Sequence, residues 1–143
     1  MSVLDTSVIL KWFLKEEDSD KAIYLSNECL NYSDDITVPD LLLYEISNAL
    51  IYKRDYLLND IKSVVESIFK SKIKIASPTL EIINIAIEFA NYYEVSIYDS
   101  TFLSLASKLN CYLITADEKF YKKIITKDKK LKIKLLKNII INQ

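Results

Sequence analysis

The chain contains neither histidine nor glycine. The absence of histidine excludes Ser-His-Asp and Cys-His catalysis, HExxH zinc sites and haem ligation through histidine. The absence of glycine excludes a P-loop and a GxGxxG dinucleotide-binding turn. Carboxylates, hydroxyls and lysines are the main groups left for catalysis. Carboxylate clusters that bind hard cations therefore become the leading class of site by elimination.

Cysteines and long apolar runs are also scarce. Cys29 and Cys111 cannot make a disulfide framework, and we expect two buried thiols in a reducing cytoplasm. The apolar runs, such as those at 41–43 and 139–141, are far shorter than a membrane span, and no signal peptide opens the chain. These observations predict a cytoplasmic protein with no membrane segment.

The length and composition favour one folded domain over residues 1–143. Half of the residues are apolar, and a chain of 143 residues can bury about two-thirds of its unfolded surface. Charge is unevenly spread, because residues 1–60 hold twelve acidic and five basic side chains, whereas residues 118–143 hold nine lysines and two acidic side chains. This asymmetry fits a metal site beside a polyanion track, and it equally fits a solvated surface.

Short apolar segments of strand type alternate with longer segments of helical periodicity. We expect strands at 2–4, 36–38, 73–76, 111–115 and 139–141, and helices at 8–14, 22–30, 41–53, 61–69, 80–90, 99–109 and 118–125. Asp34 and Asp35 are expected to turn the chain into the second strand. The alternation predicts an α/β fold, with a parallel sheet covered by helices on both faces.

The stretch from Tyr98 to Phe120 predicts that two carboxylates meet at one edge. Asp99 opens a predicted helix, and Asp117 follows the strand that comes after this helix. A helix of about ten residues runs roughly 15 Å, and a strand of four or five residues about 13 to 16 Å. If the helix and strand pack antiparallel, Asp99 and Asp117 return to the same edge of the molecule.

Two further carboxylates are expected at this edge. Asp5 directly follows the first strand, and Glu45 lies one turn inside the helix after the second strand. Ligands of parallel sheets bind beyond the carboxyl ends of the strands. At about 4 Å each ionised pair would repel by about 4 kcal/mol, which a cation would neutralise. Mg²⁺ or Mn²⁺ suits such an oxygen-only site and could drive phosphodiester hydrolysis.

Each of these residues also has a purely structural interpretation. Asp5, Asp99 and Asp117 each precede a predicted helix, where aspartate is among the best N-caps, and Glu45 alone could be an ordinary polar helix residue. Asp40 is interpreted only as a helix cap. In a chain without glycine, we expect asparagines to take the left-handed positions at helix ends, namely Asn31, Asn59 and Asn110.

Four segments of the sequence resemble the motifs of PIN domains, and most closely those of the VapC toxins of toxin–antitoxin pairs. The segments are VLDTS at 3–7, VPDLLLYE at 38–45, YDSTFLSLA at 98–106 and LITAD at 113–117. They cover nearly the whole chain in the family's order and spacing. The resemblance implies a compact three-layer α/β/α domain with a short, mostly parallel central sheet. It also implies an endoribonuclease that depends on Mg²⁺ or Mn²⁺.

The resemblance also implies residue roles and partners. Asp5, Asp99 and Asp117 match metal ligands, Glu45 would bind the metal directly or through water, and Ser7 and Thr115 match hydroxyl positions that support the acidic residues. The implied partners are an RNA substrate, a small VapB-like antitoxin whose tail blocks the site, and a second copy in a homodimer. Many relatives carry a glycine near the position of Asn110, and asparagine tolerates the same backbone region.

Two other functions remain open. The chain could be a catalytically silent PIN-fold module that binds RNA or protein, with apolar helices such as 41–58 building an interface. A phosphoaspartyl phosphatase is a weaker alternative, because Ser7 occupies the place of the second aspartate that such enzymes need. Tyrosines such as Tyr24, Tyr44 and Tyr52 are interpreted as packing or dimer contacts. The lysines between Lys119 and Lys137 could neutralise RNA phosphates or form a solvated face.

Overall fold

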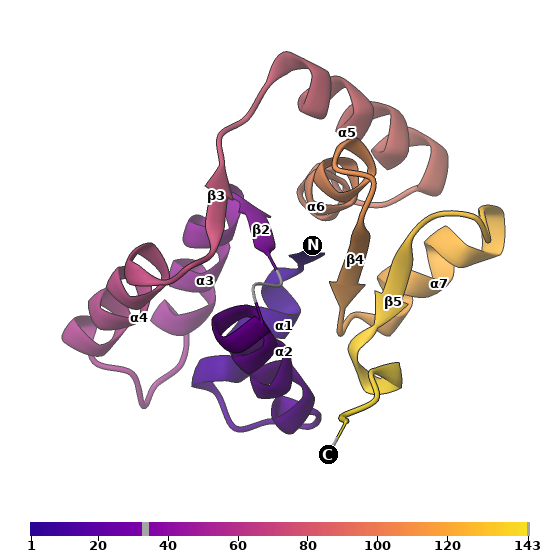
Figure 1. Cartoon of the computed structure of the whole chain (residues 1–143). Helices are drawn as coiled ribbons and strands as arrows, with labels where there is room; N and C mark the ends of the chain where they lie inside the picture. Colours follow the sequence, from indigo (N-terminus) through magenta and orange to yellow (C-terminus); the bar gives the residue numbers. More distant parts are fainter. Residues whose placement is uncertain (33–34, 143) are drawn as a thin grey trace.

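Five parallel strands form one central sheet in the order β3-β2-β1-β4-β5 (Figure 1). This computed structural model of the chain describes residues 1–32 and 35–142, so the predicted turn residue Asp34 lies outside the described residues. The strands are β1 (Ser2–Leu4), β2 (Ile36–Pro39), β3 (Lys74–Ala76), β4 (Tyr112–Thr115) and β5 (Ile133–Leu135). Every described strand pair is parallel, as the alternation of segments predicts.

Helices flank both faces of this sheet, which confirms the three-layer α/β/α architecture. Figure 1 shows α5 and α6 on one side of the central strands and α1 and α2 on the other. The α-helices are α1 (Thr6–Phe13), α2 (Ser19–Tyr32), α3 (Leu41–Ile51), α4 (Leu58–Lys70), α5 (Leu80–Tyr93), α6 (Ile97–Lys108) and α7 (Glu118–Lys127), and a 3₁₀ turn, η1, spans Leu136–Asn138. In the described part of the chain, none of these helices has the length and apolarity that a membrane span requires.

A large part of the core lies where α6 packs between α5 and the central strands. Phe102 and Leu103 of α6 are almost fully buried, and α6 contacts β1, β2 and β4. Full burial of one such side chain contributes about 1.5–3 kcal/mol. Toward α5, the Ser104 hydroxyl donates a hydrogen bond to the Ile82 carbonyl at 2.6 Å. Ser100, one turn earlier, is also fully buried, and its Oγ is the one buried side-chain oxygen or nitrogen without a partner among the described residues.

The strand register brings the ends of β1 and β4 to the same edge. Leu4 lies opposite Ile114, and the Asp5 amide donates to the Ile114 carbonyl at 3.0 Å. The two residues that follow these pairs, Asp5 and Thr115, therefore emerge side by side at the carboxyl edge of the sheet. This is the edge at which the sequence predicts the carboxylates.

The prediction of a last strand at residues 139–141 is wrong. The fifth strand is Ile133–Leu135, where two buried side chains alternate with exposed Lys134, whereas residues 139–142 form no strand. The apolar run at 139–141 is misleading, because Ile140 is 79% exposed. Ile133 and Leu135 alternate with lysines, so the period-two pattern is too short to recognise in the sequence. Pairing with β4 places this segment in the sheet.

The left-handed positions are only partly those predicted. Asn110 has φ 52°, as expected, but the other two are Asp18 and Glu94, with φ 60° and 55°. Asn31 and Asn59 lie within α2 and α4, which extend beyond the predicted ends, so neither residue has to turn the chain.

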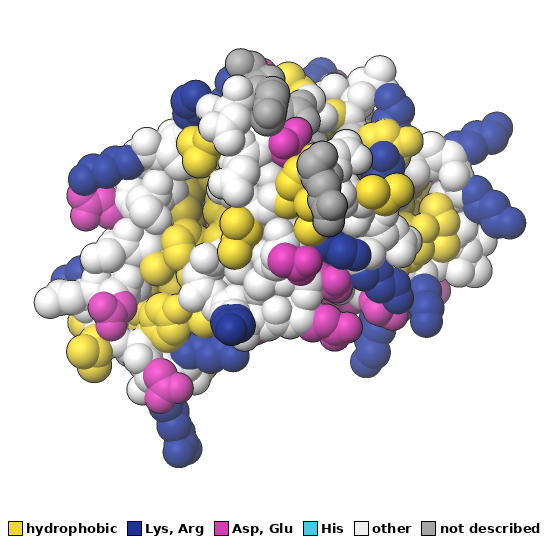
Figure 2. All heavy atoms as spheres, turned by 60° about the horizontal axis from the view of Figure 1, so that its bottom comes forward, with side chains coloured by type: hydrophobic (Ala, Val, Ile, Leu, Met, Phe, Trp, Pro, Cys, Tyr) yellow, Lys and Arg dark blue, Asp and Glu magenta, His cyan; other side chains and the backbone are white. Residues whose placement is uncertain are grey.

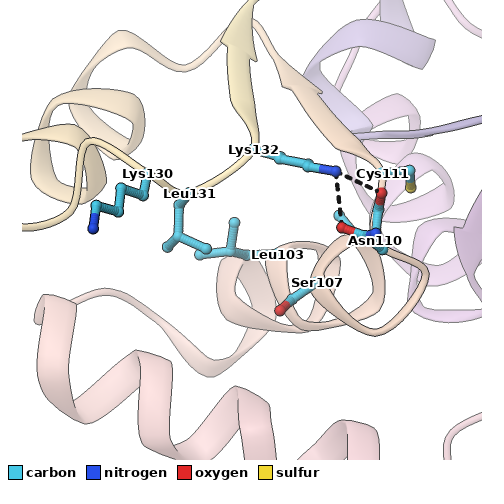
Figure 3. A pocket seen from close by; sticks show the side chains of 8 residues that line it. Leu103, Ser107, Asn110, Cys111, Lys130, Leu131 and Lys132 are labelled. Carbon is cyan, nitrogen blue, oxygen red and sulfur yellow. Dashed lines mark hydrogen bonds between the residues drawn. The ribbon is translucent and has the colours of Figure 1, made fainter.

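A lysine contacts each of these three left-handed residues. Lys132 Nζ donates to the carbonyl and side-chain oxygens of Asn110 at 3.0 and 2.8 Å, as Figure 3 shows beside a pocket of about 170 Å³. Lys123 Nζ donates to the Glu94 carbonyl at 2.8 Å, and Lys21 forms an ion pair with Asp18 at 3.7 Å. The pocket in Figure 3 lies at the end of α6 remote from Asp99, so it is not part of the carboxylate edge.

The other predictions about side-chain burial have mixed outcomes. Cys29 and Cys111 are buried and free, as expected. Tyr44 and Tyr52 are 72% and 79% exposed, so neither packs within this chain, and their interpretation as dimer contacts stays a prediction. Both lie on or directly after α3, on the side that faces away from the buried Leu42, Ile46 and Leu50 stripe.

Candidate carboxylate site at the sheet edge

Asp5 is the most enclosed of the predicted carboxylates. It caps α1, and its Oδ1 accepts a hydrogen bond from the Thr6 amide at 2.9 Å. Its Oδ2 accepts from Ser7 Oγ at 2.7 Å and Thr115 Oγ1 at 2.8 Å. The side chain is only 7% exposed. Burial raises the pKa of Asp5, the hydroxyl and amide hydrogen bonds partly offset this rise, and the charge of Asp99 adds to it.

The hydroxyls of Ser7 and Thr115 connect Asp5 to the turn after β4. Ser7 Oγ accepts from the Ala116 amide at 3.0 Å, and Thr115 Oγ1 accepts from the Asp117 amide at 3.1 Å. Because each hydroxyl donates its single hydrogen to Asp5, neither has one left for the 3.4 Å contact between them. The two residues that the motifs match to a supporting role therefore hold the Asp5 carboxylate and the turn together.

Glu45 joins this network through a residue to which the sequence alone assigns no role. Thr6 Oγ1 donates to Glu45 Oε1 at 2.8 Å and so links α1 to α3. Burial raises the pKa of Glu45, the Thr6 hydrogen bond lowers it in part, and Asp5 and Asp99 raise it further. The position of Thr6 beside Asp5 is the only sequence signal for this contact, because its partner lies 39 residues away.

Asp99 does not cap its helix, contrary to one interpretation of the sequence. Ser96 is the N-cap of α6, and its Oγ accepts from the Asp99 amide at 3.0 Å. Serine caps a helix as well as aspartate does, and an acidic residue is favoured at the third helical position. The carboxylate of Asp99 is half-buried. Burial raises its pKa, a hydrogen bond with Ser96 opposes the rise, and the charge of Asp117 contributes to it.

Asp117 is exposed and caps α7, as predicted. Its Oδ1 accepts from the Phe120 amide at 3.0 Å, which leaves Oδ2 without a hydrogen bond among the described residues. Asp40 is not a cap in the predicted sense. It occupies the position before α3, but its backbone is already helical and its side chain makes no capping hydrogen bond. The chain passes from β2 into α3 without the extended residue that a side-chain cap requires.

The four predicted carboxylates are electrostatically coupled in two groups. We name Asp5 and Glu45, with the hydroxyls of Thr6, Ser7 and Thr115, the networked half, and Asp99 and Asp117 the open half. Asp99 raises the pKa of Asp5 and Glu45, and Asp117 raises that of Asp99, so the charges of the two halves act on each other. Mutual repulsion is the feature that a bound cation would relieve.

The donor atoms fit a hard divalent cation. They are carboxylate oxygens supported by hydroxyls, without histidine or thiolate, and such oxygens suit Mg²⁺ or Mn²⁺. Within residues 1–32 and 35–142, however, no three His, Cys, Asp or Glu side chains are drawn together into a group that could hold a metal ion. The chemistry of the site and its repulsion agree with the predicted metal, while the side chains are not closed into a coordination shell.

The fold and this edge define an α/β protein with a cluster of acidic residues beyond the ends of parallel strands. The PIN domain family matches residues 2–132, and the chain belongs to that family. A comparison with curated protein sequences gives no match.

Solved structures of toxin–antitoxin proteins share the fold. VapBC2 from Rickettsia felis bound to a promoter DNA fragment is 17% identical, covering 94% of this chain and 97% of that chain, with a TM-score of 0.68. VapC20 from Mycobacterium tuberculosis, a toxin that cleaves the sarcin-ricin loop, is 13% identical over 85% and 93% of the two chains, with a TM-score of 0.68. FitAcB from Neisseria gonorrhoeae is 13% identical over 97% and 100%, with a TM-score of 0.69. At these identities the likeness shows the fold.

Proposed function

We propose that this protein is a divalent-metal-dependent endoribonuclease of the VapC type. The observation that carries the proposal is the coupling of Asp5, Glu45, Asp99 and Asp117 at the carboxyl edge of the sheet. The likeness to VapC20, described as a sarcin-ricin loop cleaving toxin, supports RNA as the substrate. Cys29 and Cys111 are free, which suits a reducing cytoplasm.

The proposed roles follow from the contacts. Asp5, Asp99 and Asp117 would hold Mg²⁺ or Mn²⁺, with Glu45 as a further ligand, directly or through water. When bound, such a cation lowers the pKa of a coordinated water and offsets charge on a phosphodiester oxygen. Ser7 and Thr115 fix the orientation of Asp5 and favour its ionised form. Thr6 fixes the position of Glu45 relative to Asp5.

The first prediction concerns cleavage of RNA by purified protein. Wild type is expected to cleave single-stranded or structured RNA with Mg²⁺ or Mn²⁺ and to stop on chelation. Asp5→Asn and Asp99→Asn should reduce cleavage to background, because each removes one anionic ligand. Products are measured on denaturing gels over time.

Asp40→Asn is the matched control for these variants. It makes the same chemical change at an aspartate that has no capping hydrogen bond and lies outside the coupled set. Its cleavage should equal that of wild type. Cleavage that survives both Asp5→Asn and Asp99→Asn would belong to a contaminant or to another site, and would sink the mechanism.

The proposal includes a VapB-like antitoxin and a homodimer. The similar structures of VapBC2 and FitAcB carry paired toxin–antitoxin names, which supports an antitoxin here. Figure 2 shows hydrophobic side chains gathered at the left of the view, where α3 and α4 lie in Figure 1. Exposed apolar residues of these helices and their connection include Ile51, Leu57, Leu58 and Phe69. Such a surface is suited to protein contact.

The exposed apolar surface also favours the second candidate, a catalytically silent PIN-fold module that binds RNA or protein. This module would bind its partner equally well with and without divalent cations. Loss of all binding on adding a chelator would count against it, and metal-dependent cleavage abolished by Asp5→Asn would exclude it.

A further inference from the structure

A groove of about 290 Å³ separates the C-terminal end of α5 from the second half of α7. Its lining is basic, because it contains three lysines and one glutamate. Burial and the neighbouring Asp128 raise the pKa of Tyr93 to about 12, so this tyrosine adds no negative charge. The lining residues are Tyr93, Glu94, Lys122, Lys123, Thr126 and Lys127.

The segments that line the groove also carry or lead to the open half of the carboxylate site. Asp117 caps α7, and Lys122 and Lys123 follow about 8 Å further along the helix axis. On the other wall, Glu94 ends α5 and stands two residues before Ser96, the cap of the helix that carries Asp99. The groove is therefore bounded by the segments that position both carboxylates of the open half.

The lysines of the groove keep donors available for a ligand. Lys123 Nζ donates to the Glu94 carbonyl at 2.8 Å, and Lys127 Nζ donates to the Tyr92 carbonyl at 2.6 Å and lies 3.6 Å from the Glu94 carboxylate. An ammonium group has three donors, so neither lysine is saturated. The side chain of Lys122 is exposed, and its Nζ makes no hydrogen bond or ion pair within the described part of the chain, although its carbonyl accepts a hydrogen bond from Thr126.

An exposed aromatic ring lies beside two residues of this groove, Tyr93 and Lys127. Tyr92 is 57% exposed, and its ring meets that of Tyr93 edge to face, with centroids 4.9 Å apart. Lys127 Nζ lies 5.2 Å from the Tyr92 ring centroid. These neighbours hold the ring in place while more than half of the residue remains accessible. A basic groove combined with an aromatic surface is the arrangement that binds single-stranded nucleic acid.

We propose that this groove and Tyr92 form a track for single-stranded RNA next to the cleaved bond, with Lys122, Lys123 and Lys127 on phosphates and Tyr92 stacked on a base. The track rests on the proposed ribonuclease function, because it supplies the strand to the same carboxylate site. An acidic peptide would match the lysines but would make no use of the Tyr92 ring.

The test measures RNA affinity separately from cleavage. All variants are made in the full-length Asp5→Asn protein with a chelator present, and binding of a labelled oligouridine is followed by fluorescence anisotropy at several salt concentrations. Lys122→Ala should lower the salt slope by about 0.7 and weaken binding about fivefold at 0.1 M salt. Lys62→Ala, an exposed lysine of α4, is the charge-matched control and should leave the slope unchanged.

A second variant tests whether the ring of Tyr92 stacks on a base. Tyr92→Leu should weaken oligouridine binding about tenfold without changing the salt slope, because stacking releases no counterions. Tyr52→Leu, at a tyrosine that is 79% exposed beside α3, should have no effect. Melting temperatures verify that each variant is folded.

The track is overturned if Lys122→Ala and Tyr92→Leu both bind oligouridine as the Asp5→Asn parent does, or if polyglutamate binds and oligouridine does not. Failure of the ribonuclease proposal looks different. In that case wild type binds oligouridine through Lys122 and Tyr92 but cleaves nothing with Mg²⁺ or Mn²⁺. Cleavage by wild type with an unchanged KM in Lys122→Ala and Tyr92→Leu removes the track alone.

Discussion

The networked half and the open half of the site hold their carboxylates in opposite ways. Asp5 accepts three hydrogen bonds and is 7% exposed, whereas Asp117 is exposed and accepts one hydrogen bond from its own helix. The hydrogen-bond partner of Asp99 is likewise local, because it is Ser96 at the start of α6. Rigid side chains set the position of a ligand, and less constrained ones can adjust to it. The contrast indicates that the networked half is held in place by the protein alone. Under the proposed function, the open half would complete the site around the cation.

The largest effect in this comparison is expected at Thr6. Thr6→Val keeps the shape of the side chain but removes the donor to Glu45, so the networked half loses its connection to α3. Loss of such an outer hydrogen bond reduces metal-site activity by about 10- to 100-fold. The rate of RNA cleavage and its dependence on Mg²⁺ concentration are the measurements.

Thr6→Ser is the control, because it keeps the hydroxyl. It should retain most of the cleavage rate. A Thr6→Val variant as active as wild type would mean that Glu45 needs no fixed position, and the distinction between the two halves would lose its basis.

A smaller effect is expected next to Asp99, where the buried Ser100 hydroxyl has no partner among the described residues. Ser100→Ala removes this group from α6, and leaving a buried polar group unpaired costs about 1–3 kcal/mol. The variant should raise the free energy of unfolding by about 1 kcal/mol, which urea denaturation measures. Ser104→Ala, which loses a real hydrogen bond to Ile82, should instead be destabilising. A destabilised Ser100→Ala would show that the hydroxyl is paired after all.

The smallest effect is expected in the pH dependence of stability without divalent cations. The pKa values of Asp5, Glu45 and Asp99 are all raised, so the folded protein binds protons more tightly than the unfolded chain. The contribution of these three groups to stability is therefore fully present below about pH 4 and is lost as pH rises through their folded pKa values. The exposed ion pairs of Asp35 with Lys74 and of Glu118 with Lys137 lower the pKa values of these carboxyl groups, so their contribution to stability grows with pH. Exposed ion pairs contribute little to stability.

We therefore expect a higher melting temperature at about pH 5 than at about pH 7.5. Asp99→Asn removes one of the repelling charges without removing a helix cap, so it should melt higher than wild type at neutral pH and show a smaller pH difference. It should also gain less from added Mg²⁺. Equal melting temperatures of wild type at both pH values would contradict the raised pKa values. Because the chain has no histidine, few other groups titrate in this window.

Local sequence signals predict the framework of the site well. Asp5 directly follows an apolar strand, Asp117 lies two residues beyond another, and each precedes a helix. Their position at the sheet edge and their role as helix caps are therefore predictable. The cap of α6 is not predictable in this way. Ser96 and Asp99 lie within one turn of each other, and both are residue types that favour the start of a helix. The contact between Thr6 and Glu45 depends on how α1 and α3 approach each other, which short-range patterns do not contain.

The fifth strand illustrates a second limit. Ile133 and Leu135 are buried against β4, but they stand among lysines, and three residues are too few for a clear alternation. The longer isoleucine run at 139–141 has the stronger local signal and lies outside the sheet. Position beside an existing strand, rather than the local density of apolar residues, decides which segment pairs.

The lysines at the left-handed turns have a consequence for covalent modification. Acetylation of an amine removes its charge and most of its donors, so at Lys123 and Lys132 it would weaken the hydrogen bonds to the carbonyls of Glu94 and Asn110. In most chains glycine would keep such turns intact without help. Here an acylating reagent, or an acetyltransferase, would act on the conformation of the loops that end α5 and α6, and so on the segment that leads to Asp99 and the strand that leads to Asp117.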